Sequence, residues 1–418
     1  MPSTPRLTFP KSFLWGVGTS AHQVEGGLHN QWTVWELENA KALAAQAPYH
    51  YDDLDNWEAI KRRAKHPGNY VSGRGVSHYE RYEQDIELVR KLTMNAFRLS
   101  IEWSRVQPEQ DAWDAAAIKH YKDVLAACKK RGIEPIVTLF HTTLPVWYAQ
   151  MGGFERRANV GYFVAYATRL LAELGPLVKY VITLNDPDAY VREGYTDGHW
   201  PPQVTNWRVA MRVRHHLALA HNRIADSLHD ANRRYKVSIA KNYHYIYPGD
   251  DAWLSVKAAQ MKHYLENDAF LRKVVKRCDF IGLNYYTSDR VYGYRVHNPN
   301  HRVSDIGWDM HPHHVALALE QLYEKYNKPI MITENGLADE GDVHREWWLT
   351  QTIVGMQSAR DKGVELIGYI YASLLDGFEW EKGYWPKYGL FSVDRKTMQR
   401  SPRRSALWLA KTVRRLRE

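Results

Sequence analysis

Residues 329–336 read PIMITENG, an apolar and β-branched run that ends in the carboxyl group of Glu334 and the amide of Asn335. A short run without polar alternation is typical of a strand that is covered on both faces, as in a parallel sheet. Similar runs recur along the whole chain. The eight runs span residues 13–17, 96–101, 135–140, 178–184, 237–240, 280–285, 329–333 and 365–371. The sequence therefore predicts eight buried strands.

Longer amphipathic stretches separate these runs. Apolar residues follow the helical spacing between residues 79 and 92 and again between residues 118 and 128. Strands that alternate with helices imply a parallel sheet with helical crossovers, and eight such units close into a (β/α)8 TIM barrel of the α/β class. The rival is a doubly wound open sheet in two domains, but no linker rich in Pro, Gly or Ser divides the chain. We expect residues 1–418 to form a single barrel domain, with irregular loops at 40–76 and 289–312 over one face.

The composition narrows the function classes only in part. The chain carries 16 Trp and 27 Tyr against 10 Phe, and such half-polar rings suit a sugar, a nucleobase or a peptide ligand. The net charge of +9 raises the possibility of a nucleic acid partner. However, the basic residues are not strongly clustered; the densest run is near the C-terminus, at 403–417, where they fit the solvent-exposed face of a helix. We therefore predict no nucleic acid partner.

The cysteines and the apolar runs bear on location. Cys128 and Cys278 lie far apart, without the spacing of a metal site. No signal peptide is visible at the N-terminus, and no apolar run reaches 18 residues. These features predict a cytoplasmic protein with no membrane partner, and they leave the oligomeric state open.

Polar side chains gather where the predicted strands end, which in a barrel of this kind is where the chemistry lies. In chain order they are Gln23 and Glu25, Glu102 and Trp103, His141, Asn185 and Asp186, Asn284 and Tyr286, Glu334 and Asn335, and finally Asp376, Glu379 and Trp380. Carboxylates, amides and aromatic rings dominate this set. Two acids on opposite strands, flanked by amides and Trp, are what cleavage of a glycosidic bond requires.

Six segments make the resemblance to a known family specific. They are FPKSFLWGVGTSAHQVEGG (9–27), NAFRLSIEWSRVQP (95–108), YVITLNDP (180–187), FIGLNYYTS (280–288), PIMITENG (329–336) and LLDGFEWEKGYWPKYGLFSVD (374–394). In order and spacing the chain resembles glycoside hydrolase family 1, the retaining β-glycosidases, over nearly its whole length. The resemblance implies Glu334 as the nucleophile and Asp186, in Asn-Asp-Pro, as the acid/base. It implies no metal and no cofactor.

Further roles follow from the same resemblance. Arg98 and Tyr286 match the pair that hydrogen-bonds the nucleophile. The residues that match the family's sugar-hydroxyl contacts are Gln23, His141, Asn185, Glu379 and Trp380. Asn284, at the end of the sixth run, is expected among the substrate-binding residues as well.

The sequence departs from the family pattern at the site itself. Asp186 stands where the family usually has Glu, and Thr142 and Ala372 stand where it usually has Trp. The shorter acid loses ~1.5 Å of reach, and Asp188 is a weaker second candidate for its role. The lost Trp rings predict a wider sugar pocket, which Trp385 is expected to refill in part.

The sequence thus predicts a retaining, exo-acting β-glycosidase. Its partner would be a small-molecule or oligosaccharide β-glycoside, such as a glucoside or a glycoside with a bulkier sugar. A catalytically weakened sugar-binding protein on the same barrel, and a transglycosidase, remain alternatives at this point.

Overall fold

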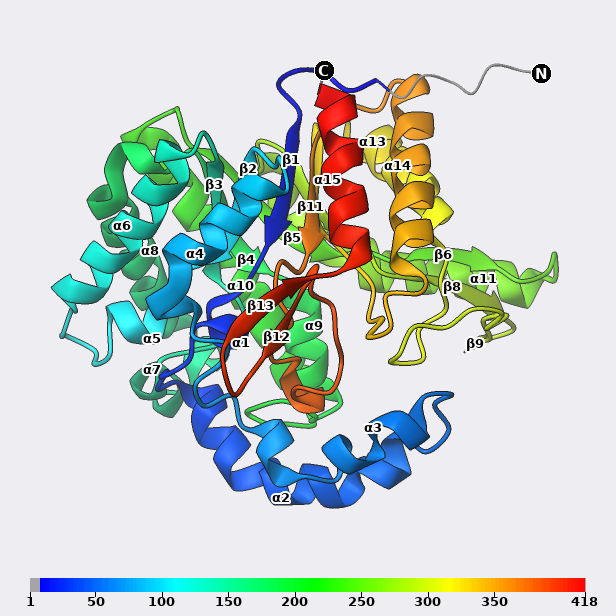
Figure 1. The fold of residues 1–418 in the computed structure, drawn as a ribbon, viewed down its shortest axis with the longest axis horizontal. Helices are drawn as coiled ribbons and strands as arrows, with labels where there is room; N and C mark the ends of the chain where they lie inside the picture. The colour runs from blue at the N-terminus through cyan, green and yellow to red at the C-terminus, as the bar shows by residue number, and fades with distance from the viewer. Residues whose placement is uncertain (1–7, 418) are drawn as a thin grey trace.

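The computed structural model describes residues 8–417, and its centre is a closed barrel of eight parallel strands (Figure 1). Around the barrel the order is β1, β11, β10, β7, β5, β4, β3, β2. The strands are β1 (Leu14–Gly18), β2 (Ala96–Ser100), β3 (Glu134–Phe140), β4 (Tyr180–Asn185), β5 (Lys236–Asn242), β7 (Ile281–Asn284), β10 (Ile330–Asn335) and β11 (Leu366–Ala372). Each of the eight predicted runs overlaps one of these strands, so the (β/α)8 prediction is confirmed.

Helices cross from each strand to the next on the outside of the barrel. The main ones are α4 (His78–Lys91), α6 (Ala115–Lys130), α8 (Val160–Leu174), α10 (Trp207–Ala231), α11 (Trp253–His263), α12 (Ala269–Val274), α13 (Val315–Tyr326), α14 (Arg345–Asp361) and α15 (Arg404–Arg417). The predicted helices near 79–92 and 118–128 are α4 and α6. α15 exposes Arg414, Arg415 and Arg417 and buries Leu409 and Val413, as its sequence indicated.

Side chains fill the barrel interior and make it a packed core. Its cluster joins residues of six strands with Phe280, and its members are Ala96, Ile136, Ile182, Ala240, Phe280, Met331 and Ile370. A larger apolar cluster lies between the strands and the surrounding helices. The packed interior leaves the C-terminal ends of the strands as the place for a ligand.

One glycine is required for the strand ends to meet. In PIMITENG, a Cβ on Gly336 would lie 1.8 Å from the carbonyl oxygen of Ala372. Only a glycine therefore lets the chain leave β10 so close to the end of β11.

Two expected loops contain regular structure instead. Residues 40–76 lie largely in α2 (Gln31–Tyr51), α3 (Trp57–Ala64) and the short helix η1 (Pro67–Tyr70). Ala at five positions between 40 and 47 favours a helix, although the apolar periodicity there is too weak to reveal it. Figure 1 shows α2 and α3 beyond the end of the barrel toward which the strands point.

The second expected loop, 289–312, overlaps a small outer sheet. β8 (Ser288–Tyr292) pairs with β6 (Tyr245–Pro248) in parallel and with β9 (Arg295–Val296) in antiparallel orientation. Within residues 8–417, no helix combines the length and the apolar character that crossing a membrane demands. The cytoplasmic location stays a prediction.

Candidate active site

The strand ends surround a cavity of about 400 Å³ at the C-terminal mouth of the barrel. Nine of the ten residues predicted for the site line it. They are Gln23, Arg98, His141, Asn185, Asp186, Tyr286, Glu334, Glu379 and Trp380. Asn284, the tenth, is fully buried beneath the cavity wall and is not among the lining residues.

Glu334, at the end of β10, is held through both of its carboxylate oxygens. Arg98 Nη1 in β2 lies 2.6 Å from Oε1, and the Tyr286 hydroxyl donates to Oε2 at 2.8 Å. Arg98 is itself fixed by Thr138 and by the Asn185 side-chain oxygen. Burial, and then the charge of Glu334, raise the pKa of Tyr286 well above its usual value, so this phenol remains a donor. The carboxylate is thereby fixed in orientation and paired with a cation.

Asp186 lies between β4 and the short helix α9 (Pro187–Val191), in a left-handed conformation with φ +41°. Asn284 Nδ2 donates to its Oδ1 at 2.9 Å, and Asn185 Nδ2 donates to its Oδ2 at 3.2 Å. Burial, followed by the nearby charge of Glu334, raises the pKa of Asp186 to about 7. Asp186 is therefore a carboxyl group that retains its proton close to neutral pH.

Asn284 also hydrogen-bonds to other residues around Asp186. Its amide nitrogen also donates to Asn185 Oδ1 at 3.0 Å, and its oxygen accepts from the Thr333 hydroxyl at 2.7 Å. One buried amide thus links the ends of β4, β7 and β10. Asn284 positions its neighbours, whereas the sequence had placed it among the groups that touch substrate.

His141, at the end of β3, presents a neutral ring to the cavity. Burial, and then the positive charge of Arg98, hold its pKa well below the usual value. Its Nε2 lies 3.2 Å from the Asn185 amide nitrogen, which makes Nε2 an acceptor and Nδ1 the protonated nitrogen. Nδ1 is buried and has no hydrogen-bond partner among the described residues.

Glu379 and Trp380 also line the cavity. Burial, and then the charge of Glu334, raise the pKa of Glu379 to about 8. The ring of Trp380 lies nearly parallel to that of His141, with centroids 6.0 Å apart.

Trp200, which the sequence did not single out, also lines the cavity and packs against Trp380, with ring centroids 5.6 Å apart. Trp308 is a second such residue, 5.9 Å from Tyr286; no local pattern distinguishes either Trp from a core residue.

Three other acids at strand ends have structural partners outside the cavity. Glu25 pairs with Arg105, Glu102 accepts a hydrogen bond from Thr143, and Asp376 pairs with Arg403. Their carboxylates brace the loops around the site.

Two further expectations are corrected. Asp188 does not line the cavity; it pairs with Arg214 at 2.9 Å and Lys241 at 3.1 Å. Trp385 is buried in an outer cluster with Ala47, Ile60 and Ala64. It cannot refill the sugar pocket, because α2 and α3 of the unexpected helical segment cover it.

One metal-like cluster lies at the edge of the cavity. His244, Glu266 and Asp289 place one potential ligand atom each within 4.8 Å of one another. The Lys262 ammonium group already pairs with both Glu266 and Asp289, so these residues form an ion-pair network.

The sequence model of Glycosyl hydrolase family 1 matches residues 6–278 and 271–417. The chain belongs to this family. Beta-glucosidase A of Thermotoga maritima is 29% identical over 97% of both chains. A solved beta-glycosidase from Pyrococcus horikoshii is 33% identical, with a TM-score of 0.86 over 98% of this chain and 96% of that one.

A third comparison concerns the ligand of a family member. The Thermotoga maritima beta-glucosidase solved in complex with glucoimidazole superimposes with a TM-score of 0.86 at 26% identity, over 98% of this chain and 99% of that one. As a member of the family, the protein described here is a glycoside hydrolase with β-glycosidase activity.

Proposed function

We propose that this family member is a retaining, exo-acting β-glycosidase in which Glu334 is the nucleophile and Asp186 is the acid/base. The observation that supports this assignment is the contrast between Glu334 and Asp186, two carboxyl groups that line the same cavity. Glu334 is paired with Arg98 and accepts from Tyr286, whereas burial raises the pKa of Asp186 to about 7.

Double displacement assigns each group a step. A Glu334 oxygen attacks the anomeric carbon while the Asp186 proton moves to the glycosidic oxygen, so that the carbon–oxygen bond breaks and an alcohol leaves. Asp186, now ionised, takes a proton from water, whose oxygen attacks the anomeric carbon and releases Glu334 with the first configuration restored. A second sugar in place of that water would give transfer, and the same residues would serve.

The sugar would lie among the remaining groups. Gln23, His141 and Glu379 offer donors and acceptors for its hydroxyls, and Trp380 offers an apolar face. Because its pKa is raised to about 8, the Glu379 carboxyl group is protonated near neutral pH and can both donate and accept a hydrogen bond.

The proposal includes Asp as an unusual acid in a family that usually has Glu. Asn284 and Asn185 donate to both of its oxygens and so fix the orientation of the shorter side chain. Thr142 and Ala372, where the family usually has Trp, line the same cavity and favour a sugar bulkier than glucose. Aryl glucosides and aryl disaccharides test this point: a clear kinetic preference for the bare glucoside would contradict it.

The decisive test follows the anomer of the product by NMR on a panel of aryl β-glycosides. The expected first product is the β-anomer, and a fluorosugar should form an adduct on Glu334 that mass spectrometry locates. A first-formed α-anomer would exclude the retaining mechanism. Binding without an adduct or turnover would favour a sugar-binding protein.

A further inference from the structure

Three histidines lie together at the start of α13. The sequence His311-Pro312-His313-His314 forms the 3-10 turn η8 (Pro312–His314), which leads into that helix. Because residues three apart eclipse in a 3-10 turn, the rings of His311 and His314 stack, with centroids 4.7 Å apart and planes at 18°. The His313 ring lies 4.4 Å from that of His314. Each histidine places one ring nitrogen within 4.8 Å of the others.

The contacts of His311 determine which of its nitrogens can bind a ligand. Its Nε2 lies 2.8 Å from Asp309 Oδ2. Since a carboxylate oxygen accepts, Nε2 carries the proton and Nδ1 keeps its lone pair. The Tyr285 hydroxyl donates to the His311 carbonyl oxygen at 2.7 Å and holds the backbone in place. A histidine that ligates a metal ion commonly donates its other nitrogen to a carboxylate in this way.

His314 is held through one nitrogen as well. Its Nδ1 lies 2.9 Å from the Ser288 hydroxyl, and this contact leaves Nε2 outside the pair. Tyr245 and Tyr247 of β6 pack against the ring, with centroids 5.2 and 5.5 Å away. His313, in contrast, is exposed, so an ion can reach the cluster from solvent.

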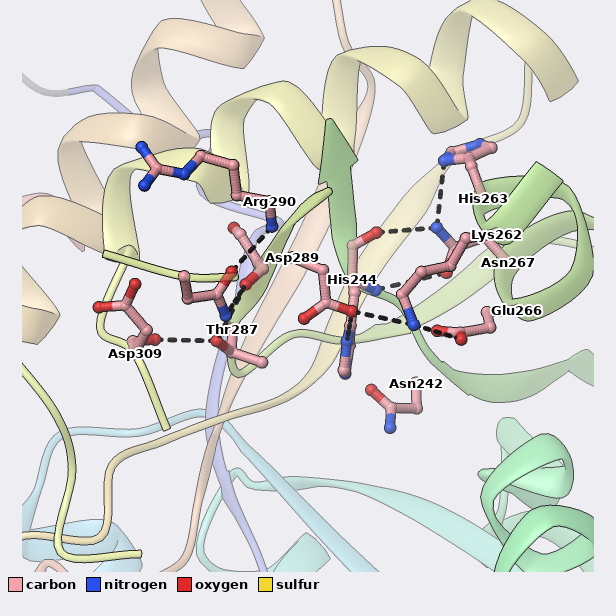
Figure 2. A network of polar contacts seen from close by, with 12 residues as sticks. Asn242, His244, Lys262, His263, Glu266, Asn267, Thr287, Asp289, Arg290 and Asp309 are labelled. Atoms are coloured by element: carbon pink, nitrogen blue, oxygen red, sulfur yellow. Dashed lines mark hydrogen bonds and ion pairs between the residues drawn. The ribbon is translucent and has the colours of Figure 1, made fainter. Parts of the chain in front are cut away.

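A neighbouring cluster shows the case in which a cation of the protein takes the central place. There the Lys262 ammonium group pairs with both Glu266 and Asp289 (Figure 2). Asp309 differs from these acids, because among residues 8–417 it forms an ion pair with His311 only. The histidine cluster therefore has ligand atoms and a carboxylate behind them, without a lysine or arginine that pairs with that carboxylate.

The cluster adjoins a loop that borders the active-site cavity. Residues 302–310 form a small hairpin whose ends pair in antiparallel orientation, and Trp308 and Asp309 of this hairpin line the cavity. The Thr287 hydroxyl donates to the carbonyl oxygen of Asp309 at 2.8 Å (Figure 2). An ion bound to His311 would therefore act, through Asp309, on a wall of the active site.

The ligand type selects the kind of ion. Imidazole nitrogen suits Zn²⁺, Ni²⁺ and Cu²⁺, whereas Mg²⁺ and Ca²⁺ prefer oxygen ligands. Two nitrogens on one tetrahedral zinc ion lie about 3.3 Å apart, because each Zn–N bond is about 2.0–2.1 Å long. The three nitrogens would thus have to approach one another by no more than roughly 1.5 Å. Rotation of the exposed His313 side chain and small shifts of the other two rings provide this movement.

We propose that His311, His313 and His314 bind one divalent transition-metal ion such as Zn²⁺, and that this ion braces the 302–310 hairpin against α13. Asp309 would orient His311 as a ligand without touching the ion. The ion would lie outside the reaction steps proposed above, and the inference does not depend on them.

Isothermal titration calorimetry of the untagged protein, cleared of metal with EDTA and then dialysed, measures zinc binding. We expect one zinc ion per chain with micromolar or tighter affinity, and no comparable binding of Mg²⁺. At a zinc concentration about a hundredfold above Kd, Tm should rise by about 3 °C. Absence of zinc binding, or binding of Mg²⁺ with equal affinity, would overturn the inference.

Three variants locate the ion. His313→Ala removes an exposed ligand, so it should weaken zinc binding by about tenfold or more and leave Tm without metal unchanged. Asp309→Asn should weaken it by about 10- to 100-fold, because an amide no longer fixes the His311 tautomer. His50→Ala, which removes an exposed histidine of α2, is the matched control and should bind zinc like the wild type. Wild-type affinity in His313→Ala would place the ion elsewhere and overturn the assignment.

Limited digestion with trypsin tests the bracing of the hairpin. Arg302, at the start of the hairpin, is exposed. Zinc should slow cleavage after Arg302 in the wild type but not in His313→Ala, because a braced loop opens less often to a protease. Equal cleavage of the wild type with and without zinc would overturn the bracing role.

Discussion

The carboxyl groups of Glu334 and Asp186 line the same cavity, but the protein surrounds them with different partners. On the side of β10, Glu334 faces a guanidinium group and a phenol, both donors, one of them charged. On the side of β4, Asp186 faces two neutral amides at the start of a short helix. The difference between a charged and a neutral partner, at similar depth, separates the two carboxyl groups into a nucleophile and an acid.

Backbone context reinforces the contrast. Glu334 lies within strand β10, which pairs with β7 and β11 in the barrel, although the register with each neighbour shifts just after Ile332. Asp186 lies just past a strand in a left-handed conformation (φ +41°), which Asp adopts more readily than most residues. The barrel thus fixes the nucleophile by its architecture and the acid by local contacts.

The largest effect is expected at the nucleophile. Glu334→Gln keeps the shape of the side chain but removes its nucleophilic oxygen, so kcat should fall about 10⁴-fold or more. Steady-state kinetics on an aryl β-glycoside measure the change. Glu173→Gln, which removes an exposed partner of Lys122, serves as the control and should retain full activity. More than a tenth of wild-type kcat in Glu334→Gln would assign the nucleophile elsewhere.

Asp186→Asn should cost about 10²- to 10⁴-fold, and the loss should depend on the substrate. Leaving groups that need protonation, such as alkyl alcohols, should lose the most, whereas dinitrophenolate should lose least in the first step. Added azide, which needs no general base, should restore turnover and give a β-glycosyl azide. Equal losses for all leaving groups would show that Asp186 does not deliver the proton.

The pH profile sharpens the contrast further. Since Asp186 must be protonated to act as an acid and its pKa is about 7, kcat/KM should decline as the pH rises above 7, approaching tenfold per unit. Asn284 donates to the ionised form and so holds this pKa down. Asn284→Ala should therefore shift the alkaline limb to higher pH, with a smaller loss of activity than Asp186→Asn. An alkaline limb at the same pH in Asn284→Ala would disconnect this amide from the acid.

The sequence predicts some parts of the fold and of the candidate site better than others. All eight strands and nine lining residues could be predicted, because buried strands carry apolar runs and the functional groups directly follow them. Asn284 follows a strand too, but its side chain lies below the surface that its neighbours share. Trp200, Trp308 and the helices of 40–76 were missed, since loops that fold over the barrel are positioned by tertiary contacts. The misplaced Trp385 is the consequence of those missed helices.

The smallest expected effect concerns stability and tests whether the acid is held at a cost. The folded protein raises the Asp186 pKa from 3.8 to about 7, so folding binds a proton that the unfolded chain releases. This penalty is absent below pH 3.8, grows between pH 3.8 and 7, and is complete above pH 7. Asn cannot ionise. Asp186→Asn should therefore increase the free energy of unfolding by about 1–3 kcal/mol at pH 8, with a gain that shrinks toward pH 5.

Urea denaturation of both proteins at pH 5 and pH 8 measures this gain, with Asp226→Asn as the matched control. Asp226 is an exposed carboxylate that pairs with Arg277, and its loss should change stability little at either pH. If Asp186→Asn were no more stable than the wild type at pH 8, the carboxyl group would be ionised without penalty. Its neutral amide partners would then suffice to stabilise a charge, and the division of roles between Glu334 and Asp186 would need another physical cause.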